Sequence, residues 1–424
     1  MRLDGKTNHF ERADGSPLFL LADTAWELLH RLSRAEVSHY LERRAEQGFR
    51  AVLTVLLAEL DGLRVPNAEG QLPLVDQDPS RLNASYLEFV DWVLERAEAL
   101  GLVVGLLPTW GDKFHLKWGP GPEIFTASTA RVFGRALGAR WADRDLFWVL
   151  GGDRALERSE HLRIVRAMAE GIRDAGANQL MTFHPCGGRS SSCYVQGEAW
   201  LDFNMLQSGH CGRDIANWDM IALDRERLPS LPVLDGEPGY EDHPVMSPSW
   251  EQTGGWFDDH DCRKAGYRAA LIGACGHVYG HHAVWQMWTP ERGEGKSHVR
   301  TPWQEALDHP GARQMRFLSE AMERWPILWG PDGVLDLDVE GVASDDPGRH
   351  GIVSPGGRPW RVAYLPTERP LRLTLRRSAG PVWLRWFCPS TGRIVDDGKL
   401  AIGAVRVVQP PCRPDSLMVV EDEG

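Results

Sequence analysis

The chain has 424 residues, of which 42% are hydrophobic and 25% are charged. That composition is typical of a folded globular protein and excludes an intrinsically disordered chain. The length is sufficient for a large barrel with a smaller second domain. The 59 Asp and Glu residues outnumber the 47 Lys and Arg residues, giving a net charge of −12. Together with the lack of a basic run, this charge argues against nucleic acid or an anionic membrane as a partner.

The N-terminal segment, the lack of a long apolar stretch and the cysteines together predict the cellular compartment of the protein. The N-terminal segment lacks the apolar core of a signal peptide, and no stretch approaches the roughly 20 apolar residues that span a bilayer. The seven cysteines are scattered, odd in number and form no Cys-x-x-Cys pair. We therefore predict reduced thiols in a cytoplasmic protein. No motif indicates a cofactor or a bound metal, so neither is expected.

Buried strands alternate with amphipathic helices through most of the chain. The predicted strands cover residues 17–22, 50–57, 102–108, 146–150, 180–183, 201–206, 231–234 and 277–279. The predicted helices include two that begin with Ser-x-x-Glu capping boxes, at Ser33–Glu36 and Ser85–Glu88, and three more near 159–175, 261–275 and 312–323. Eight strand–helix units predict a (β/α)8 TIM barrel over residues 1–327. A doubly wound sheet is the alternative, although no glycine-rich dinucleotide fingerprint follows the first strand.

The pattern changes after residue 327. Short strands separated by glycine, proline and aspartate are predicted at 334–339, 351–353, 360–365, 371–375, 382–387, 393–395 and 416–420. We expect a small C-terminal antiparallel β-sandwich over residues 328–424. It either packs against the barrel as a cap or binds sugar independently, and the absence of a linker favours the cap.

Two acidic residues follow predicted strands four and seven. Asp153 comes after the apolar run 147–150 and two glycines, and Glu237 comes after the run 231–234. The carboxyl ends of barrel strands form the active-site face, and a pair of carboxylates there is the machinery of glycoside hydrolysis. The placement resembles the clan of retaining barrel glycosidases, whose acid/base is on strand four and whose nucleophile is on strand seven. We expect a retaining separation of roughly 5–5.5 Å between the two carboxyl groups.

Other strand ends carry polar or aromatic residues that a purely structural barrel would not need. The candidates for substrate binding are Asp23, Trp110, His184, Gln207, His210, Tyr240 and Trp285. Flat aromatic rings pack against the C–H faces of sugars while polar groups bind hydroxyls. His210 and Tyr240 are expected to donate hydrogen bonds to Glu237 and to keep it ionised at neutral pH. In the alternative interpretation, Trp110 and Trp285 only seal the top of the barrel.

Motifs at the strand ends resemble those of one family. They are Asp23–Trp26, Leu107–Lys113, Gly151–Arg154, His184–Ser190, Gln207–His210, Asp235–Pro238 and Tyr279–His282, in family order. Together they resemble the apiosidase-like family of barrel glycoside hydrolases, and Trp386–Gly392 resembles the Trp-Phe-x-Pro-x-Thr-Gly motif of the β-domain attached to that family.

The resemblance implies a glycosidase with Asp153 as acid/base and Glu237 as nucleophile, acting on a plant-type or other oligosaccharide or glycoside. Two features depart from the pattern. Many family members are secreted, whereas no signal peptide is recognised here. The broader clan has Asn-Glu on strand four, whereas this chain has Gly152-Asp153. Because aspartate is one methylene shorter than glutamate, the backbone must approach the sugar more closely.

Two other functions remain open at this point. A metal-dependent hydrolase could draw its ligands from His184, His210, His243, His277, His281 and His282. The chain has no His-x-His after the first strand and no His-Glu-x-x-His, which argues against it. A non-catalytic carbohydrate-binding barrel would have been indicated by the loss of either carboxylate, and both are present. The oligomeric state is left open.

Overall fold

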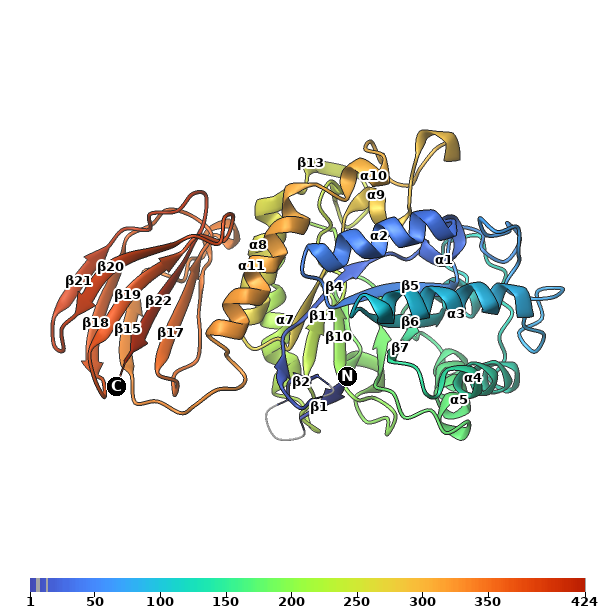
Figure 1. Ribbon diagram of the computed structural model, residues 1–424, viewed down its shortest axis with the longest axis horizontal. Coiled ribbons are helices and arrows are strands. Elements are labelled where there is room, and N and C mark those ends of the chain that lie inside the picture. Colours follow the sequence, from blue (N-terminus) through green and yellow to red (C-terminus); the bar gives the residue numbers. More distant parts are fainter. Residues whose placement is uncertain (5–7, 13, 424) are drawn as a thin grey trace.

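The computed structural model describes residues 1–4, 8–12 and 14–423, which form a barrel with a β-sandwich beside it (Figure 1). The eight parallel strands of the barrel are β4 (Leu20–Thr24), β5 (Ala51–Leu57), β6 (Val103–Thr109), β7 (Leu146–Gly151), β8 (Met181–His184), β10 (Asn204–Gln207), β11 (Val233–Asp235) and β14 (Gly276–Tyr279).

The order of these strands closes the barrel. The hydrogen-bonded order is β8-β7-β6-β5-β4-β14-β11-β10, and β9 (Arg189–Ser190) pairs antiparallel with β10. The two ends of this row, β8 and β10, lie side by side. The residues just before β10 are joined to β8 by hydrogen bonds from Asp202 N to Met181 O and from the Thr182 hydroxyl to Phe203 O. The predicted (β/α)8 barrel is therefore confirmed, and the doubly wound alternative is wrong because its sheet would remain open.

Each barrel strand is buried on both faces. Along β5, Leu53 and Val55 point into the barrel, whereas Val52 and Leu56 pack against the surrounding helices. Successive side chains of a strand point to opposite faces, so both sets of positions must be apolar. This is why the strands appear in the sequence as continuous apolar runs.

Helices surround the barrel. They are α1 (Leu28–Arg31), α2 (Arg34–Glu46), α3 (Ala84–Ala99), α4 (Ala127–Trp141), α5 (Ser159–Asp174), α6 (Ser192–Val195), α7 (Asn217–Arg225), α8 (Asp259–Leu271), α9 (His282–Trp285), α10 (Trp303–Ala306) and α11 (Pro310–Arg324). None of the helices in the described part of the chain is long and apolar enough to cross a membrane.

The helix starts test the two predicted capping boxes. The box at Ser33 and Glu36 is confirmed, with both reciprocal hydrogen bonds present at the start of α2. The box at Ser85 is wrong, because Asn83 caps α3 and accepts a hydrogen bond from the Ser85 backbone. Asparagine is as effective a cap as serine, and here it begins the helix one residue before Ser85. Helices α4 and α7 were not predicted.

The C-terminal region is an antiparallel sandwich of two sheets. One has the order β15-β18-β21 and the other β16-β17-β22-β19-β20. The strands are β15 (Asp336–Glu340), β16 (Ile352–Val353), β17 (Trp360–Leu365), β18 (Leu371–Arg377), β19 (Val382–Phe387), β20 (Ile394–Leu400), β21 (Val405–Val408) and β22 (Ser416–Asp422). The boundary predicted at 327/328 falls in the connection between α11 and β15 and stays a prediction.

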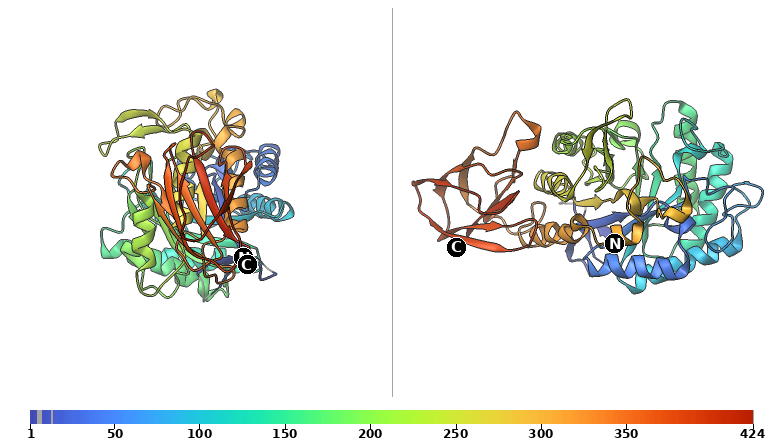
Figure 2. Two further views of the ribbon diagram at one scale, coloured as in Figure 1. Left: turned by 90° about the vertical axis from the view of Figure 1, so that its left-hand side faces the viewer. Right: turned by 90° about the horizontal axis from the view of Figure 1, so that it is seen from above.

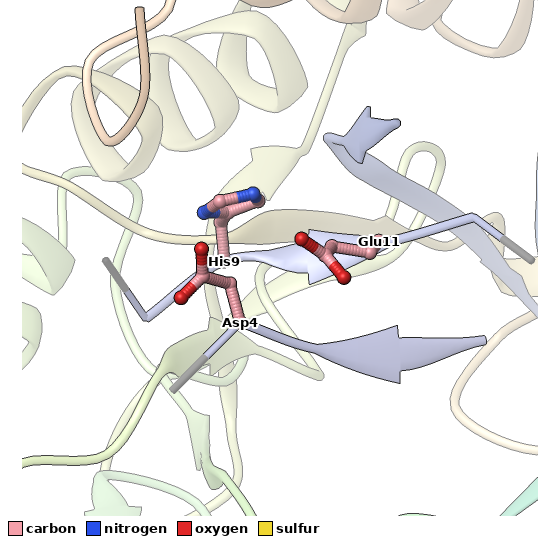
Figure 3. A group of neighbouring side chains, drawn as sticks. All are labelled: Asp4, His9 and Glu11. Carbon is pink, nitrogen blue, oxygen red and sulfur yellow. The ribbon is translucent and has the colours of Figure 1, made fainter. Parts of the chain in front are cut away.

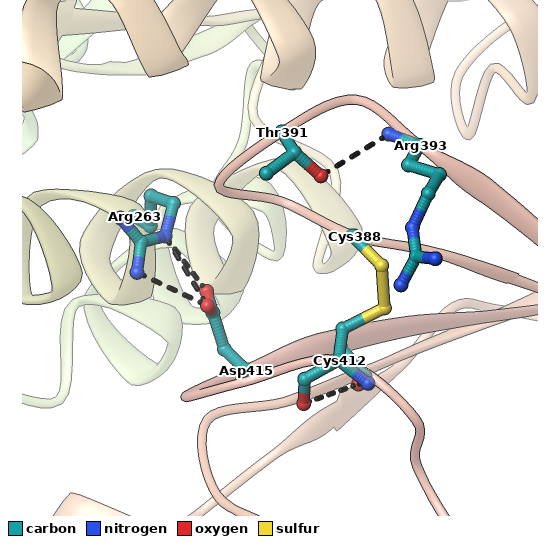
Figure 4. Close-up of a disulfide and its surroundings, with 7 residues drawn as sticks. Arg263, Cys388, Thr391, Arg393, Cys412 and Asp415 are labelled. Carbon is teal, nitrogen blue, oxygen red and sulfur yellow. Dashed lines mark hydrogen bonds and ion pairs between the residues drawn. A yellow bond between two sulfur atoms is a disulfide. The ribbon is translucent and has the colours of Figure 1, made fainter.

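The sandwich packs against the flank of the barrel formed by α8 and α11 (Figures 1 and 2). Across this contact, Arg263 of α8 lies 3.0 Å from the carboxylate of Asp415, and both side chains are buried (Figure 4). The rings of Tyr267 and Tyr364 stack at 5.0 Å between their centroids. A buried ion pair and a pair of stacked aromatic rings therefore join the sandwich to the barrel.

Two cysteines of the sandwich correct the prediction of seven reduced thiols. Cys388 and Cys412 form a disulfide, with their Cα atoms 5.4 Å apart (Figure 4). They are 24 residues apart in sequence, and only the return of the chain to β22 brings them together. The inference of a reducing compartment rested on seven free thiols, so it loses that support.

Candidate active site

A left-handed turn after β7 presents Asp153. Gly151, Gly152 and Asp153 have successive φ values of 92°, 113° and 51°. Gly152 is held on both sides, because its carbonyl accepts from Gly111 N at 3.0 Å and its N–H donates to His184 O at 3.2 Å. A Cβ at Gly152 would lie 2.9 Å from a backbone atom of Trp110, so only glycine fits. Aspartate tolerates the left-handed region better than most residues, which suits it to the end of this turn.

Glu237 lies between two histidines from neighbouring strands. His184 Nε2, at the end of β8, lies 3.0 Å from Oε2 of Glu237, and His210 Nε2 lies 3.1 Å from Oε1. The Nδ1 atom of His184 accepts a hydrogen bond from the backbone N–H of Asp153 at 3.2 Å. Neutral imidazole has one N–H, so this bond places the proton of His184 on Nε2, facing Glu237.

The surroundings shift the pKa values of the two carboxyl groups in opposite directions. Burial, together with the charge of Glu237, raises the pKa of Asp153 to about 6. Burial alone would also raise the pKa of Glu237, but hydrogen bonds from His184 and His210 outweigh it and lower the pKa. Two carboxyl groups with separated pKa values are the arrangement that general acid catalysis beside an ionised carboxylate requires.

Aromatic side chains pack around the two histidines. The Trp26 indole N–H donates to the Tyr240 hydroxyl at 3.1 Å, and the rings of Trp26 and Trp110 lie 5.4 and 5.9 Å from that of His184. The Tyr240 ring lies 4.6 Å from that of His210. Burial and then the charge of Glu237 raise the pKa of Tyr240 well above its usual value, so this phenol stays neutral. The structure thus brings His184 and His210 to Glu237, with Trp110 packed against His184 and Tyr240 against His210.

Asp23 lies elsewhere. Its carboxylate is fully buried between β4 and α2, where it pairs with Arg44 at 2.7 Å and accepts from the Tyr40 hydroxyl. Along β4, Ala22 points into the barrel while Leu21 and Asp23 point outward. The alternation of side chains along a strand therefore separates Asp23 from the residues around Glu237.

The two remaining substrate-binding candidates, Gln207 and Trp285, are nearly buried. Trp285 packs in the inner core of the barrel and donates its indole N–H to His282 Nδ1 at 3.2 Å. Gln207 ends β10 with 4% of its surface exposed. The exposed fractions of Trp110 and Trp285 are 3% and 8%, so both tryptophans are buried, and Trp110 contacts His184.

Several buried polar atoms near the carboxylates lack hydrogen-bond partners within the described residues. They are Trp110 Nε1, Gln207 Oε1 and His210 Nδ1. His184 Nε2 and Glu237 Oε2 also lack hydrogen-bond geometry, although they lie 3.0 Å apart. A buried polar group without a partner costs roughly 1–3 kcal/mol, and such groups in native proteins call for an explanation. A ligand rich in hydroxyl groups would supply partners for both donors and acceptors.

The family model described as "Apiosidase-like, catalytic domain" matches residues 5–329. The chain belongs to the apiosidase-like family. The structure of this family member is similar to a solved structure described as a glycoside hydrolase, with a TM-score of 0.86 and 26% identity over 99% of this chain and 96% of that one. It is also similar to a glycoside hydrolase family 5 protein from Bacteroides vulgatus, with a TM-score of 0.87 and 25% identity over 99% and 93%. No curated protein sequence matches the chain. The predicted family is confirmed, and the protein is a glycoside hydrolase.

Two residues of this apiosidase-like hydrolase were not predicted at the site. Trp118, in the loop after β6, donates its indole N–H to Asp153 Oδ2 at 3.1 Å. Glu59 lies two residues after β5, and burial with the charge of Asp153 raises its pKa to about 8. Asp153 was predicted because it is an acidic residue that follows a barrel strand, and the same criterion would have predicted Glu59. Nothing in the local sequence marks Trp118, because it lies nine residues after the end of β6.

The histidines proposed as alternative metal ligands lie partly in contact with one another. His184 and His210 face Glu237. The ring of His243 stacks on that of His210 at 4.2 Å and lies 4.3 Å from that of His282. Within the described residues, none of these histidines belongs to a group with the spacing of metal ligands. His282 Nε2 donates to Ser297 O at 2.9 Å, and His281 and His309 share a hydrogen bond of 2.9 Å between ring nitrogens.

A group of residues that includes none of these histidines does have the spacing of metal ligands. In the described part of the chain, the only such group is Asp4, His9 and Glu11 (Figure 3). It belongs to the small sheet of β1 (Arg2–Leu3), β2 (Phe10–Glu11) and β3 (Pro17–Leu18). That sheet precedes β4 and so lies at the amino end of the barrel strands, away from Asp153.

Proposed function

We propose that this apiosidase-like hydrolase cleaves glycosidic bonds with retention of anomeric configuration, with Glu237 as nucleophile and Asp153 as acid/base. The observation that carries the proposal is the opposite effect of the surroundings on the two carboxyl groups. His184 and His210 favour the ionised form of Glu237, as a nucleophile requires. Burial and the charge of Glu237 favour the protonated form of Asp153, as an acid requires.

In the first step, a carboxylate oxygen of Glu237 attacks the anomeric carbon as the bond from that carbon to the leaving oxygen breaks. Asp153 gives its proton to the leaving oxygen, so the leaving group departs as a neutral alcohol. The two histidine N–H groups stay beside Glu237 and stabilise the carboxylate before attack. The products of this step are a glycosyl ester on Glu237 and ionised Asp153.

The second step uses Asp153 in the opposite sense. Esterification of Glu237 removes the negative charge that raises the pKa of Asp153, so its pKa falls and its ionised form is favoured. Asp153 then accepts a proton from water as the water oxygen attacks the anomeric carbon. The ester bond breaks and Glu237 leaves as a carboxylate, again between His184 and His210.

The substrate we propose is a plant-type oligosaccharide or glycoside, and membership of the apiosidase-like family makes apiosides the first compounds to test. The unpartnered atoms of Trp110, Gln207 and His210 support a hydroxyl-rich sugar ring on the glycone side. Each of these atoms would gain a hydrogen bond from the bound substrate. A sugar that lacks the matching hydroxyl would leave the atom without a partner, so the site would strongly favour the correct sugar.

Product stereochemistry tests the mechanism. A panel of aryl glycosides and cell-wall oligosaccharides identifies a substrate, and proton NMR then follows the first anomer released. We expect that anomer to have the configuration of the substrate, because two displacements at one carbon restore it. Initial release of the opposite anomer would overturn the proposal, and Asp153 would then protonate the leaving group while Glu237 activates water.

The pH dependence of kcat/KM should be bell-shaped. Activity requires ionised Glu237, so it rises at low pH through the lowered pKa of this residue. It also requires protonated Asp153, so it falls as pH rises through about 6. The substrate should have a poor leaving group, since only such a substrate depends on the acid. A rate that stays constant from about pH 5 to about pH 8 would contradict the role of Asp153.

A further inference from the structure

Trp118 is an exposed aromatic side chain that is hydrogen-bonded to a partly buried carboxyl group. It lies in the loop between β6 and α4 with 42% of its surface exposed. Its indole N–H donates to Oδ2 of Asp153 at 3.1 Å, and the side chain of Asp153 itself is only 22% exposed. The feature that distinguishes Trp118 from other exposed apolar side chains is its hydrogen bond to the proposed acid.

Arg154 holds this ring in place. Its guanidinium carbon lies 4.0 Å from the centroid of the Trp118 ring, and the arginine is fully buried. The same guanidinium donates to the backbone carbonyls of Trp118 and of His115, the latter at 3.1 Å, and to Asp153 O at 2.7 Å. Arg154 therefore packs against one face of the Trp118 indole and also holds the loop that contains Trp118. A stacked guanidinium, buried from solvent, makes the ring a rigid platform.

We propose that Trp118 forms the leaving-group subsite, where its ring stacks on the apolar face of a sugar residue beyond the scissile bond. The inference rests on the proposed role of Asp153. The acid must reach the leaving oxygen, so a side chain bonded to the acid's own Oδ2 lies on the leaving-group side. Indole rings pack well against the C–H faces of sugars. The substrate class is therefore a glycoside whose leaving group is itself a sugar.

The indole N–H has a second effect at the same place. It favours the ionised form of Asp153, which is the form that acts as base in the second step. The other charged or titratable groups that act on Asp153 are Glu237, which opposes ionisation, and Arg154 and His184, which favour it. Asp153 in turn raises the pKa of Glu59, so the charges of these two carboxyl groups interact.

Two substrates with the same glycone test the subsite, one with a sugar as leaving group and one with methanol. Both have poor leaving groups, so both require Asp153, and only the first can stack. Trp118→Ala should lower kcat/KM for the sugar leaving group by about 3- to 10-fold relative to the methyl glycoside. Leu116→Ala, an exposed apolar residue of the same loop, is the matched control and should show no such selectivity.

Trp118→Phe separates the ring from its N–H. It should retain most of the preference for the sugar leaving group and move the alkaline limb of the pH profile to higher pH, because the ionised acid loses a donor. An equal change on both substrates in Trp118→Ala, or no change, would overturn the subsite. An unmoved alkaline limb in Trp118→Phe would overturn the effect on Asp153. Loss of turnover in Glu237→Gln, measured beside these variants, shows whether the proposed function stands when the subsite fails.

Discussion

Replacement of Glu237 by glutamine should remove turnover of every glycoside substrate, activated or not. An amide is a very poor nucleophile, so no glycosyl ester forms, and neither a good leaving group nor an intact Asp153 compensates. The expected loss is on the order of 10⁴-fold or more, the scale observed when a member of a nucleophilic catalytic set is disabled. Steady-state kinetics on an aryl glycoside measures it, with thermal unfolding to show that the variant is folded.

Glu241→Gln is a matched control for that experiment. Glu241 is also a buried carboxyl group, but it accepts hydrogen bonds from the Tyr279 hydroxyl and from Gly311 N at the start of α11. We expect a lower melting temperature with kcat retained in the folded fraction, since this glutamate does not touch the site. A 2-fluoro glycoside that traps the ester should label Glu237 in the wild type. A label on another residue, or Glu237→Gln activity within about tenfold of wild type, would contradict the assignment.

Asp153→Asn should show a loss that depends on the leaving group. General acid catalysis contributes typically about 10²- to 10⁴-fold, and we expect a loss of that size for oligosaccharides. Activated aryl glycosides need no proton, so their first step should be nearly unaffected and the glycosyl ester should accumulate. Asparagine, like aspartate, tolerates the φ of 51° at this position, whereas alanine would add backbone strain. The substitution therefore removes the acidic proton of residue 153 and preserves the backbone conformation of the turn.

Added azide distinguishes this loss from general damage. The azide ion attacks the glycosyl ester without a base, so it should restore turnover of an aryl glycoside by Asp153→Asn and yield the glycosyl azide with retained configuration. It should not restore Glu237→Gln, which forms no ester. Equal and mild losses on both substrate types, with no response to azide, would mean that Asp153 supports the site without transferring a proton.

Much of the barrel was predictable because its strands are locally unambiguous. Short apolar runs such as 146–150 and 231–234 can be satisfied only by burial on both faces, and their number and spacing indicate a closed parallel barrel. The same rule places Asp153 and Glu237 at one face, because the carboxyl ends of all barrel strands meet there. The capping box at Ser33 was also predictable, since all its atoms lie within one helical turn.

A continuous apolar run does not indicate whether a polar residue at its end points into the barrel or toward the surrounding helices. Asp23 was predicted at the rim because it ends a strand, yet it points toward Arg44 and α2. When both faces of a strand are apolar, the sequence offers no mark of the inward face, so the orientation depends on register in the closed barrel. The disulfide of Cys388 with Cys412 and the contact of Trp118 with Asp153 depend in the same way on how loops return in space.

By itself, the sequence determined the barrel, the family motifs and the two strand ends that carry carboxyl groups, because these follow from local apolar patterns and from the geometry common to all such barrels. The tertiary structure alone decided the surroundings of each carboxyl group. His184 ends β8 and His210 lies three residues after β10, yet both face Glu237, and Trp118 reaches Asp153 from a distant loop. A pKa depends on charges and donors within a few ångströms, and those neighbours are defined by folding, not by order along the chain.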